Sequence, residues 1–71
     1  MNNNNALQLA TYTLEGGQVL SATTVKNYIA PGATDQEVLY FIELCKAQKL
    51  NPFVRDAYLV KYGNQPAQII V

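Results

Sequence analysis

Histidine is absent from this 71-residue chain, and other residue types that build reactive sites are scarce. Without histidine, the chain lacks the commonest general base and a frequent metal ligand. Its single cysteine, Cys45, cannot form an internal disulfide, and no histidine can join it in a zinc site or a nucleophilic pair. We therefore expect no enzyme activity, no catalytic residue, no metal and no cofactor, and a reducing cytoplasmic location.

Long apolar segments and targeting signals are also missing. The chain has no run of about 20 apolar residues, the length that crosses a membrane. Its first residues, Met1 followed by four asparagines, have neither the basic nor the apolar region of a signal peptide. We expect residues 1–8 to form a disordered asparagine-rich leader, residues 9–71 to fold, and no membrane partner.

Charge is sparse and unevenly distributed. The net charge is zero, which by itself argues against a nucleic-acid-binding protein. Residues 1–44 carry four acidic side chains and one basic side chain, a net charge of −3. Residues 45–71 carry one acidic side chain and four basic ones, a net charge of +3: Lys46, Lys49, Arg55 and Lys61. This asymmetry predicts that any anion-binding surface lies in the C-terminal part.

The strongest local pattern predicts a helix that begins after Thr34 and ends before Asn51-Pro52. Thr34 and Glu37 have the spacing of a capping box, in which each side chain bonds the other residue's backbone N–H. Proline then stops the helix, because it excludes the preceding residue from the α region. Four apolar residues recur at helical spacing and should form the buried stripe: Val38, Phe41, Ile42 and Cys45.

Shorter elements are predicted before that helix. Alternation over residues 9–14 indicates a short strand, and Val19-Leu20 a second extended piece after a Gly-Gly turn. Ser21 is a plausible N-cap for a first helix over residues 22–29. Three residues of that helix are expected to face the core: Val25, Tyr28 and Ile29.

A hairpin is predicted after the second helix. Its strands run over residues 57–62 and 67–71, joined by a Gly-Asn-Gln-Pro turn. The expected fold class is therefore α+β, with a short N-terminal strand, two helices and a C-terminal β-hairpin packed on the second helix. The apolar residues 69–71 further suggest a fragment of a larger sheet.

Arg55 is the first candidate for a phosphate contact. It lies in a connection, where functional residues are common, and its guanidinium can donate two parallel hydrogen bonds to a phosphate. The alternatives are a local ion pair with Asp56 or Glu43, or plain solvation. Lys61 lies on the predicted strand, where it could follow a nucleic-acid backbone or guard a sheet edge against aggregation.

The remaining basic and aromatic candidates are expected, in the first place, to stabilise the fold rather than to bind a ligand. Lys46 and Lys49 suit the C-terminal end of a helix dipole, with ligand contact as the alternative. Phe53 is expected to plug the gap between helix and hairpin, with stacking on a nucleic-acid base as the alternative. Tyr58 and Tyr62 are expected to be half-buried with wet hydroxyls rather than stacking platforms.

Several short segments, in this order and spacing, are shared with one protein family. They are Ala33 to Glu37, Cys45 to Leu50, the Asn51-Pro52-Phe53 break, and Tyr58 to Ala67, preceded by a helix-like segment from Val19 to Ile29. In these segments the chain resembles the RecT/Bet (Red-beta-like) phage recombinases, which are single-strand annealing proteins. The resemblance implies that residues 9–71 are the N-terminal part of a longer annealing core.

The resemblance also implies a function and partners. The longer protein would bind and anneal complementary single DNA strands in phage-type homologous recombination, without ATP. It would self-associate into rings or filaments and work beside a phage exonuclease. In related proteins a basic residue shortly after the Asn-Pro-aromatic break lies near the DNA; Arg55 is the matching residue here, and Lys61 is a weaker extension of the idea.

A second class of function is an alternative. Five basic residues are few for gripping a phosphate backbone. The chain could instead be a small interaction or oligomerisation module, with no DNA binding of its own. Its hairpin would then complete a partner's sheet by edge pairing.

Overall fold

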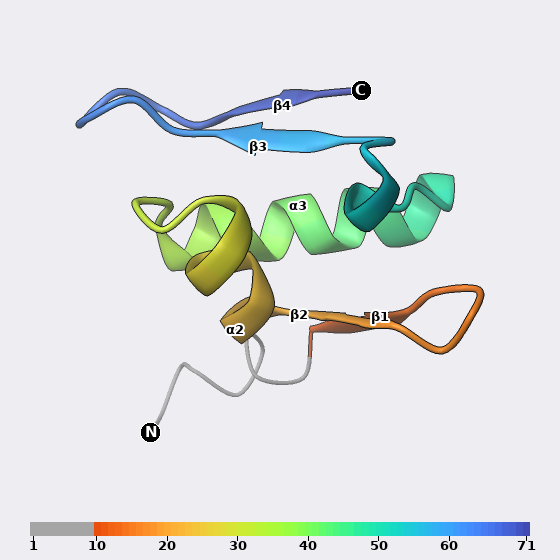
Figure 1. The fold of residues 1–71 in the computed structure, drawn as a ribbon. Helices are drawn as coiled ribbons and strands as arrows, with labels where there is room; N and C mark the ends of the chain where they lie inside the picture. Colours follow the sequence, from red (N-terminus) through yellow and green to blue (C-terminus); the bar gives the residue numbers. More distant parts are fainter. Residues whose placement is uncertain (1–9) are drawn as a thin grey trace.

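The second predicted helix lies between two antiparallel hairpins (Figure 1). The computed structural model describes residues 10–71, so the predicted leader over residues 1–8 lies outside the described residues. The elements in chain order are β1 (Thr11–Thr13), β2 (Val19–Ser21), α2 (Ala22–Thr24), η1 (Val25–Ile29), α3 (Asp35–Gln48), η2 (Pro52–Val54), β3 (Tyr58–Val60) and β4 (Gln68–Ile70). The predicted α+β class is confirmed.

The first hairpin joins two segments that the sequence predicted as separate extended pieces. β1 and β2 are antiparallel, and Tyr12 lies opposite Leu20. Gly16 and Gly17 form the turn with φ of +96° and +91°, a region that glycine enters without steric cost. The N–H of Leu14 donates to the carbonyl of Gln18 at 2.7 Å and closes the loop.

The first helix follows directly from β2 and widens into a π-helical turn. Ser21 caps it as predicted, because its hydroxyl accepts the N–H of Thr24 at 3.3 Å. Val25 is fully buried, but Tyr28 is 82% exposed, so its predicted core position is wrong. The N–H of Ala30 donates to the carbonyl of Val25, five residues back. The prediction assumed that residues three or four positions apart lie on the same face of the helix. In the wider π-helical turn this spacing no longer holds, so Tyr28 does not share the buried face of Val25.

α3 begins as predicted and ends slightly earlier. Thr34 and Glu37 form the full capping box. The helix ends at Gln48 because Lys49 adopts a left-handed conformation with φ of 57°. The N–H groups of Lys49 and Leu50 both donate to the carbonyl of Cys45, which satisfies the helix end before the proline is reached.

The core lies where α3 meets the first helix and both hairpins. The predicted stripe of α3 is confirmed, since all four of its residues are fully buried. Each large apolar side chain buried there contributes about 1.5–3 kcal/mol. The largest fully buried side chains are Phe41, Leu20, Ile42, Val25, Val38 and Cys45.

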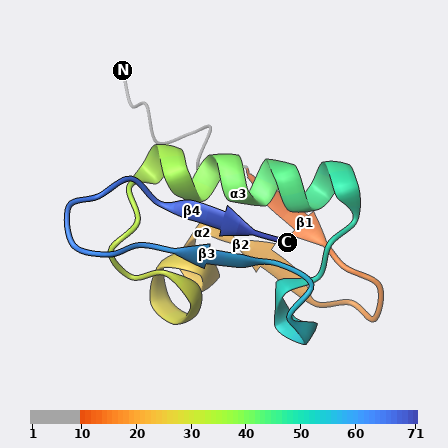
Figure 2. The same ribbon diagram turned by 90° about the horizontal axis from the view of Figure 1, so that it is seen from above.

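The second hairpin covers the other side of α3 and is buried on one face only. β3 and β4 are antiparallel, with Tyr58 opposite Ile70 and Leu59 opposite Ile69. Leu59 is 4% exposed and faces the core, whereas Tyr58 and Ile70 are 45% and 49% exposed. Seen from above, β4 runs beside α3 and β3 lies on the side of η1 (Figure 2).

Candidate functional site

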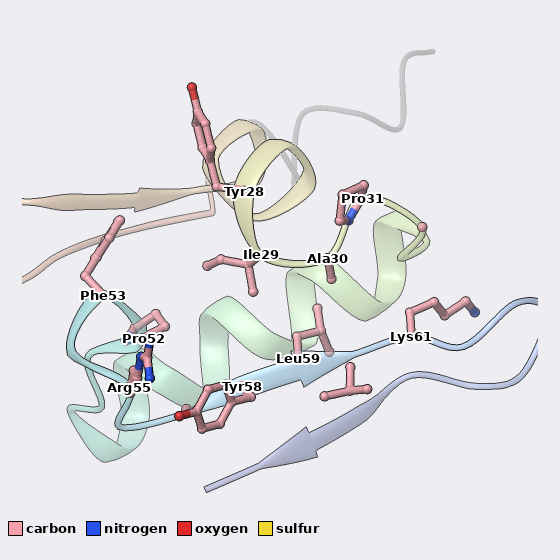
Figure 3. Close-up of a pocket in the computed structure, with 13 residues that line it drawn as sticks. Tyr28, Ile29, Ala30, Pro31, Pro52, Phe53, Arg55, Tyr58, Leu59 and Lys61 are labelled. Atoms are coloured by element: carbon pink, nitrogen blue, oxygen red, sulfur yellow. The ribbon is translucent and has the colours of Figure 1, made fainter.

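Two of the four predicted basic residues line a groove between the first helix and β3. This η1–β3 groove has a volume of about 470 Å³. Figure 3 shows Arg55 and Lys61 beyond opposite ends of β3; Ile29 and Ala30 lie between the first helix and the strand, and Tyr28 points away from the strand. The groove is lined by Tyr28, Ile29, Ala30, Pro31, Gly32, Pro52, Phe53, Arg55, Ala57, Tyr58, Leu59, Val60 and Lys61.

The lining of the η1–β3 groove suits an anion that carries flat apolar groups. It includes two basic side chains and no acidic one. Three of its residues are exposed aromatics, Tyr28, Phe53 and Tyr58. Single-stranded nucleic acids are held by such a combination of positive charge along the backbone and aromatic rings against the bases.

Arg55 is presented by a short, tightly bonded turn. The side chain of Asn51 accepts the N–H of Phe53 at 2.9 Å, and the carboxylate of Asp56 accepts the N–H of Asn51 at 2.9 Å. Arg55 itself has φ of 67°, a left-handed conformation that costs a non-glycine residue about 1–2 kcal/mol. The turn therefore holds Arg55 at an exposed apex.

The local ion pairs considered for Arg55 are not formed. Within residues 10–71, Arg55 pairs with neither Asp56 nor Glu43. The ion pairs of this part of the chain join Lys26 to Asp35 and Lys61 to Glu37. The guanidinium of Arg55 thus keeps its hydrogen-bond donors available for a ligand.

Lys61 is held in the fold by an acidic partner. Its Nζ lies 3.1 Å from Oε2 of Glu37, and its side chain is only 11% exposed. The same Oε2 accepts the N–H of Ala67 at 2.8 Å, and Oε1 accepts the N–H of Thr34 at 2.8 Å. Glu37 therefore connects the start of α3 to both sides of the loop between β3 and β4.

The ionisation of Glu37 follows from these contacts. The pKa of Glu37 is lowered to about 2. The largest effect comes from the hydrogen bond donated by the backbone N–H of Thr34, the next largest from that of Ala67, and a smaller one from Lys61. The carboxylate is therefore charged at neutral pH and accepts all three donors.

The other two predicted basic residues line a different groove. This β1–α3 groove has a volume of about 580 Å³ and is lined by Tyr12, Thr13, Leu14, Glu15, Lys46, Lys49, Asn51, Val54 and Asp56. Lys46 and Lys49 are balanced there by Glu15 and Asp56. The structure therefore does not bring the four predicted basic residues together: Arg55 and Lys61 line one groove, and Lys46 and Lys49 line another.

Phe53 differs from its predicted structural role. It is 42% exposed and lines the η1–β3 groove, so it does not plug the gap between helix and hairpin. The cap that Asn51 provides to the Phe53 N–H winds residues 52–54 into a 3₁₀ turn, which turns the ring outward. Tyr28 is a groove residue that the sequence prediction missed, because helical spacing assigned it to the core.

Cys45 is a core residue, as predicted. The pKa of its thiol is raised to about 11, mainly by burial and to a lesser extent by the nearby charge of Asp56. The thiol is therefore protonated and unreactive at neutral pH. Over residues 10–71, no helix has the length and apolar character needed to cross a membrane.

Comparison with known proteins gives one match. The family model described as RecT family matches residues 18–71, well over half of the chain. The matched segment includes every residue of the η1–β3 groove. No curated protein and no solved structure matches the chain.

Proposed function

This chain belongs to the RecT family, and from that membership we propose that it serves in the annealing of single DNA strands during phage-type homologous recombination. Proteins of this family are annealing proteins and generally not catalytic enzymes. We assign residues 9–71 to the N-terminal part of an annealing core that acts in the cytoplasm.

The observation that carries the proposal is the composition of the η1–β3 groove. Arg55 supplies unpaired positive charge at one end, Lys61, which is paired with Glu37, lies at the other, and no acidic side chain lines the groove. A DNA strand along β3 would place phosphates at both ends and its bases against Phe53 and Tyr58. Contacts to phosphate carry no sequence information, which suits a protein that must anneal strands of any sequence.

The four proposed DNA contacts differ in the support they receive. Arg55 has the strongest, since it is exposed, unpaired with its acidic neighbours and next to an exposed aromatic ring. Lys61 lines the same groove but is engaged with Glu37. Lys46 and Lys49 are secondary contacts, because Glu15 and Asp56 oppose them in the β1–α3 groove.

The proposal is tested by titrating a fluorescent single-stranded oligonucleotide with the chain at two salt concentrations. We expect binding that weakens as salt rises, because each phosphate neutralised releases a counterion. A second assay measures the pairing rate of two complementary oligonucleotides with and without the chain. Binding that is absent at low salt, together with an unchanged pairing rate, would contradict the proposal for this chain.

The proposed partners are single-stranded DNA, further copies of the chain in rings or filaments, and a phage exonuclease. Light scattering with and without the oligonucleotide tests self-association. Retention of the exonuclease on immobilised chain tests the third partner. Neither assay depends on the groove being correctly identified.

An interaction module is the second candidate, and the outer face of the second hairpin favours it. Tyr58 and Ile70 lie opposite each other on that face and are about half exposed. Exposed apolar residues on a two-stranded sheet invite pairing with another strand. An Ile70→Lys variant that turns oligomers into monomers while DNA binding persists would separate the two functions.

A further inference from the structure

The ion pair between Glu37 and Lys61 has a feature that a purely structural pair does not need. Glu37 accepts two backbone N–H groups in addition to Lys61, from Thr34 and from Ala67. If Lys61 left, the carboxylate would still have two charge-assisted hydrogen bonds. Losing Lys61 would therefore leave no orphaned charge on α3.

Lys61 also borders the η1–β3 groove, where a second anion would compete with Glu37 for it. Its side chain lines the η1–β3 groove (Figure 3). Its Nζ contacts Glu37, which does not line that groove. A lysine has a flexible stem and a compact charge with three donors, so rotation of the stem suffices to move the ammonium.

We propose that Glu37 is a positioning residue that withholds Lys61 from the η1–β3 groove until a DNA phosphate displaces it. This inference rests on the proposed function and deepens it. A strand first contacts Arg55, which is exposed and unpaired with its acidic neighbours. A phosphate at the far end of β3 then takes Lys61 from Glu37, while Thr34 and Ala67 keep the carboxylate in place.

The exchange lowers affinity in a measurable way, because the ion pair must open before Lys61 binds phosphate. Glu37→Gln removes the competing charge and keeps a side chain that can cap α3. We expect this variant to bind an oligonucleotide about five-fold more tightly at low salt, which corresponds to the upper value for ion pairs at a protein surface. The gain should vanish in the Glu37→Gln, Lys61→Met double variant.

Asp35→Asn is the matched control. It changes charge by the same amount in the same turn of α3, and it breaks the other ion pair, to Lys26. Lys26 lines neither groove, so we expect its affinity change to be less than about two-fold. Weaker binding by Glu37→Gln, or an equal gain in both single variants, overturns the inference.

A measurement on the unaltered chain covers the case in which Glu37→Gln does not fold. Nuclear magnetic resonance follows Lys61 Nζ, the Glu37 carboxylate and the Ala67 amide as an oligonucleotide is added. We expect the first two signals to shift and the Ala67 amide to stay protected from exchange. Binding with all three unchanged overturns the inference alone, whereas no salt-dependent binding overturns the proposed function as well.

Discussion

The two grooves hold equal numbers of basic residues and yet differ in what they can bind. The η1–β3 groove is lined by Arg55 and Lys61 and by no acidic residue, although Glu37 pairs with Lys61 from outside the lining. The β1–α3 groove is lined by Lys46 and Lys49 together with two acidic residues, Glu15 and Asp56. The first groove also has three aromatic lining residues and the second only Tyr12. The comparison teaches that a count of basic residues does not locate an anion site, because the acidic residues beside them decide its net charge.

The largest expected effect comes from the aromatic residues. Phe53→Leu should weaken single-stranded DNA binding at least about five-fold, since stacking of one base contributes about 1–3 kcal/mol. The matched change in the other groove is Tyr12→Leu, which should leave the affinity unchanged. Fluorescence anisotropy of a labelled oligonucleotide measures both, and equal losses would erase the distinction between the grooves.

The left-handed residues offer a comparison in which stability and binding change in opposite directions. Arg55 and Lys49 have φ of 67° and 57°, and each lines one of the two grooves. Replacing either with glycine should stabilise the fold by up to about 1 kcal/mol, because the steric cost disappears. Arg55→Gly should lose DNA affinity about five-fold, and Lys49→Gly should lose less, because Lys49 is a secondary contact.

Thermal unfolding measures the stability of these glycine variants, and fluorescence anisotropy measures their DNA affinity. Since Arg55→Gly should be the more stable protein and the weaker binder, unfolding cannot explain its loss of affinity. If Lys49→Gly loses as much affinity as Arg55→Gly, the β1–α3 groove contributes equally and the comparison fails.

The turn that presents Arg55 and Phe53 should affect stability and binding in the same direction. Asn51→Ala removes the side-chain acceptor for the Phe53 N–H. Loss of such a cap costs about 0.5–2 kcal/mol, so the chemical-denaturation midpoint should fall. DNA affinity should fall with it. Asn64→Ala, in the exposed turn of the second hairpin, is the control and should change neither quantity.

Acid should weaken the attachment of the second hairpin through Glu37. The pKa of Glu37 in the fold is about 2, below its ordinary value of 4.5. A lowered pKa gives stability that is present above the ordinary value and is lost as pH falls toward the folded value. We expect the melting temperature to fall between about pH 4.5 and 2, and to fall less in Glu37→Gln. Parallel curves for the two proteins would contradict this role.

Local patterns predicted α3 well because its determinants lie within the helix. The capping box spans four residues, and the buried stripe follows from helical spacing alone. Ser21 was identified as a cap for the same reason. By contrast, Tyr28 was misplaced because a π-helical turn follows from tertiary packing and not from a residue pattern.

The candidate site was only partly predictable. Arg55 and Lys61 were identified as basic residues near a helix break and on a strand, but their shared groove is built from two separate segments, residues 28–32 and 52–61. The contacts of Glu37 with Lys61 and Ala67 span 24 and 30 residues. The sequence predicted that Glu37 caps α3, but it could not show that the same carboxylate also pairs with Lys61.

The salt dependence of single-stranded DNA affinity tests the central claim most directly. It is measured for the unaltered chain, for Arg55→Ala and for Lys46→Ala. Binding through phosphates in the η1–β3 groove predicts that Arg55→Ala makes the plot of log affinity against log salt shallower by about 0.7. Lys46→Ala should make it shallower by less than Arg55→Ala does, because Glu15 and Asp56 line the β1–α3 groove beside Lys46. Equal slopes for Arg55→Ala and the unaltered chain would contradict the assignment of Arg55 as a phosphate contact.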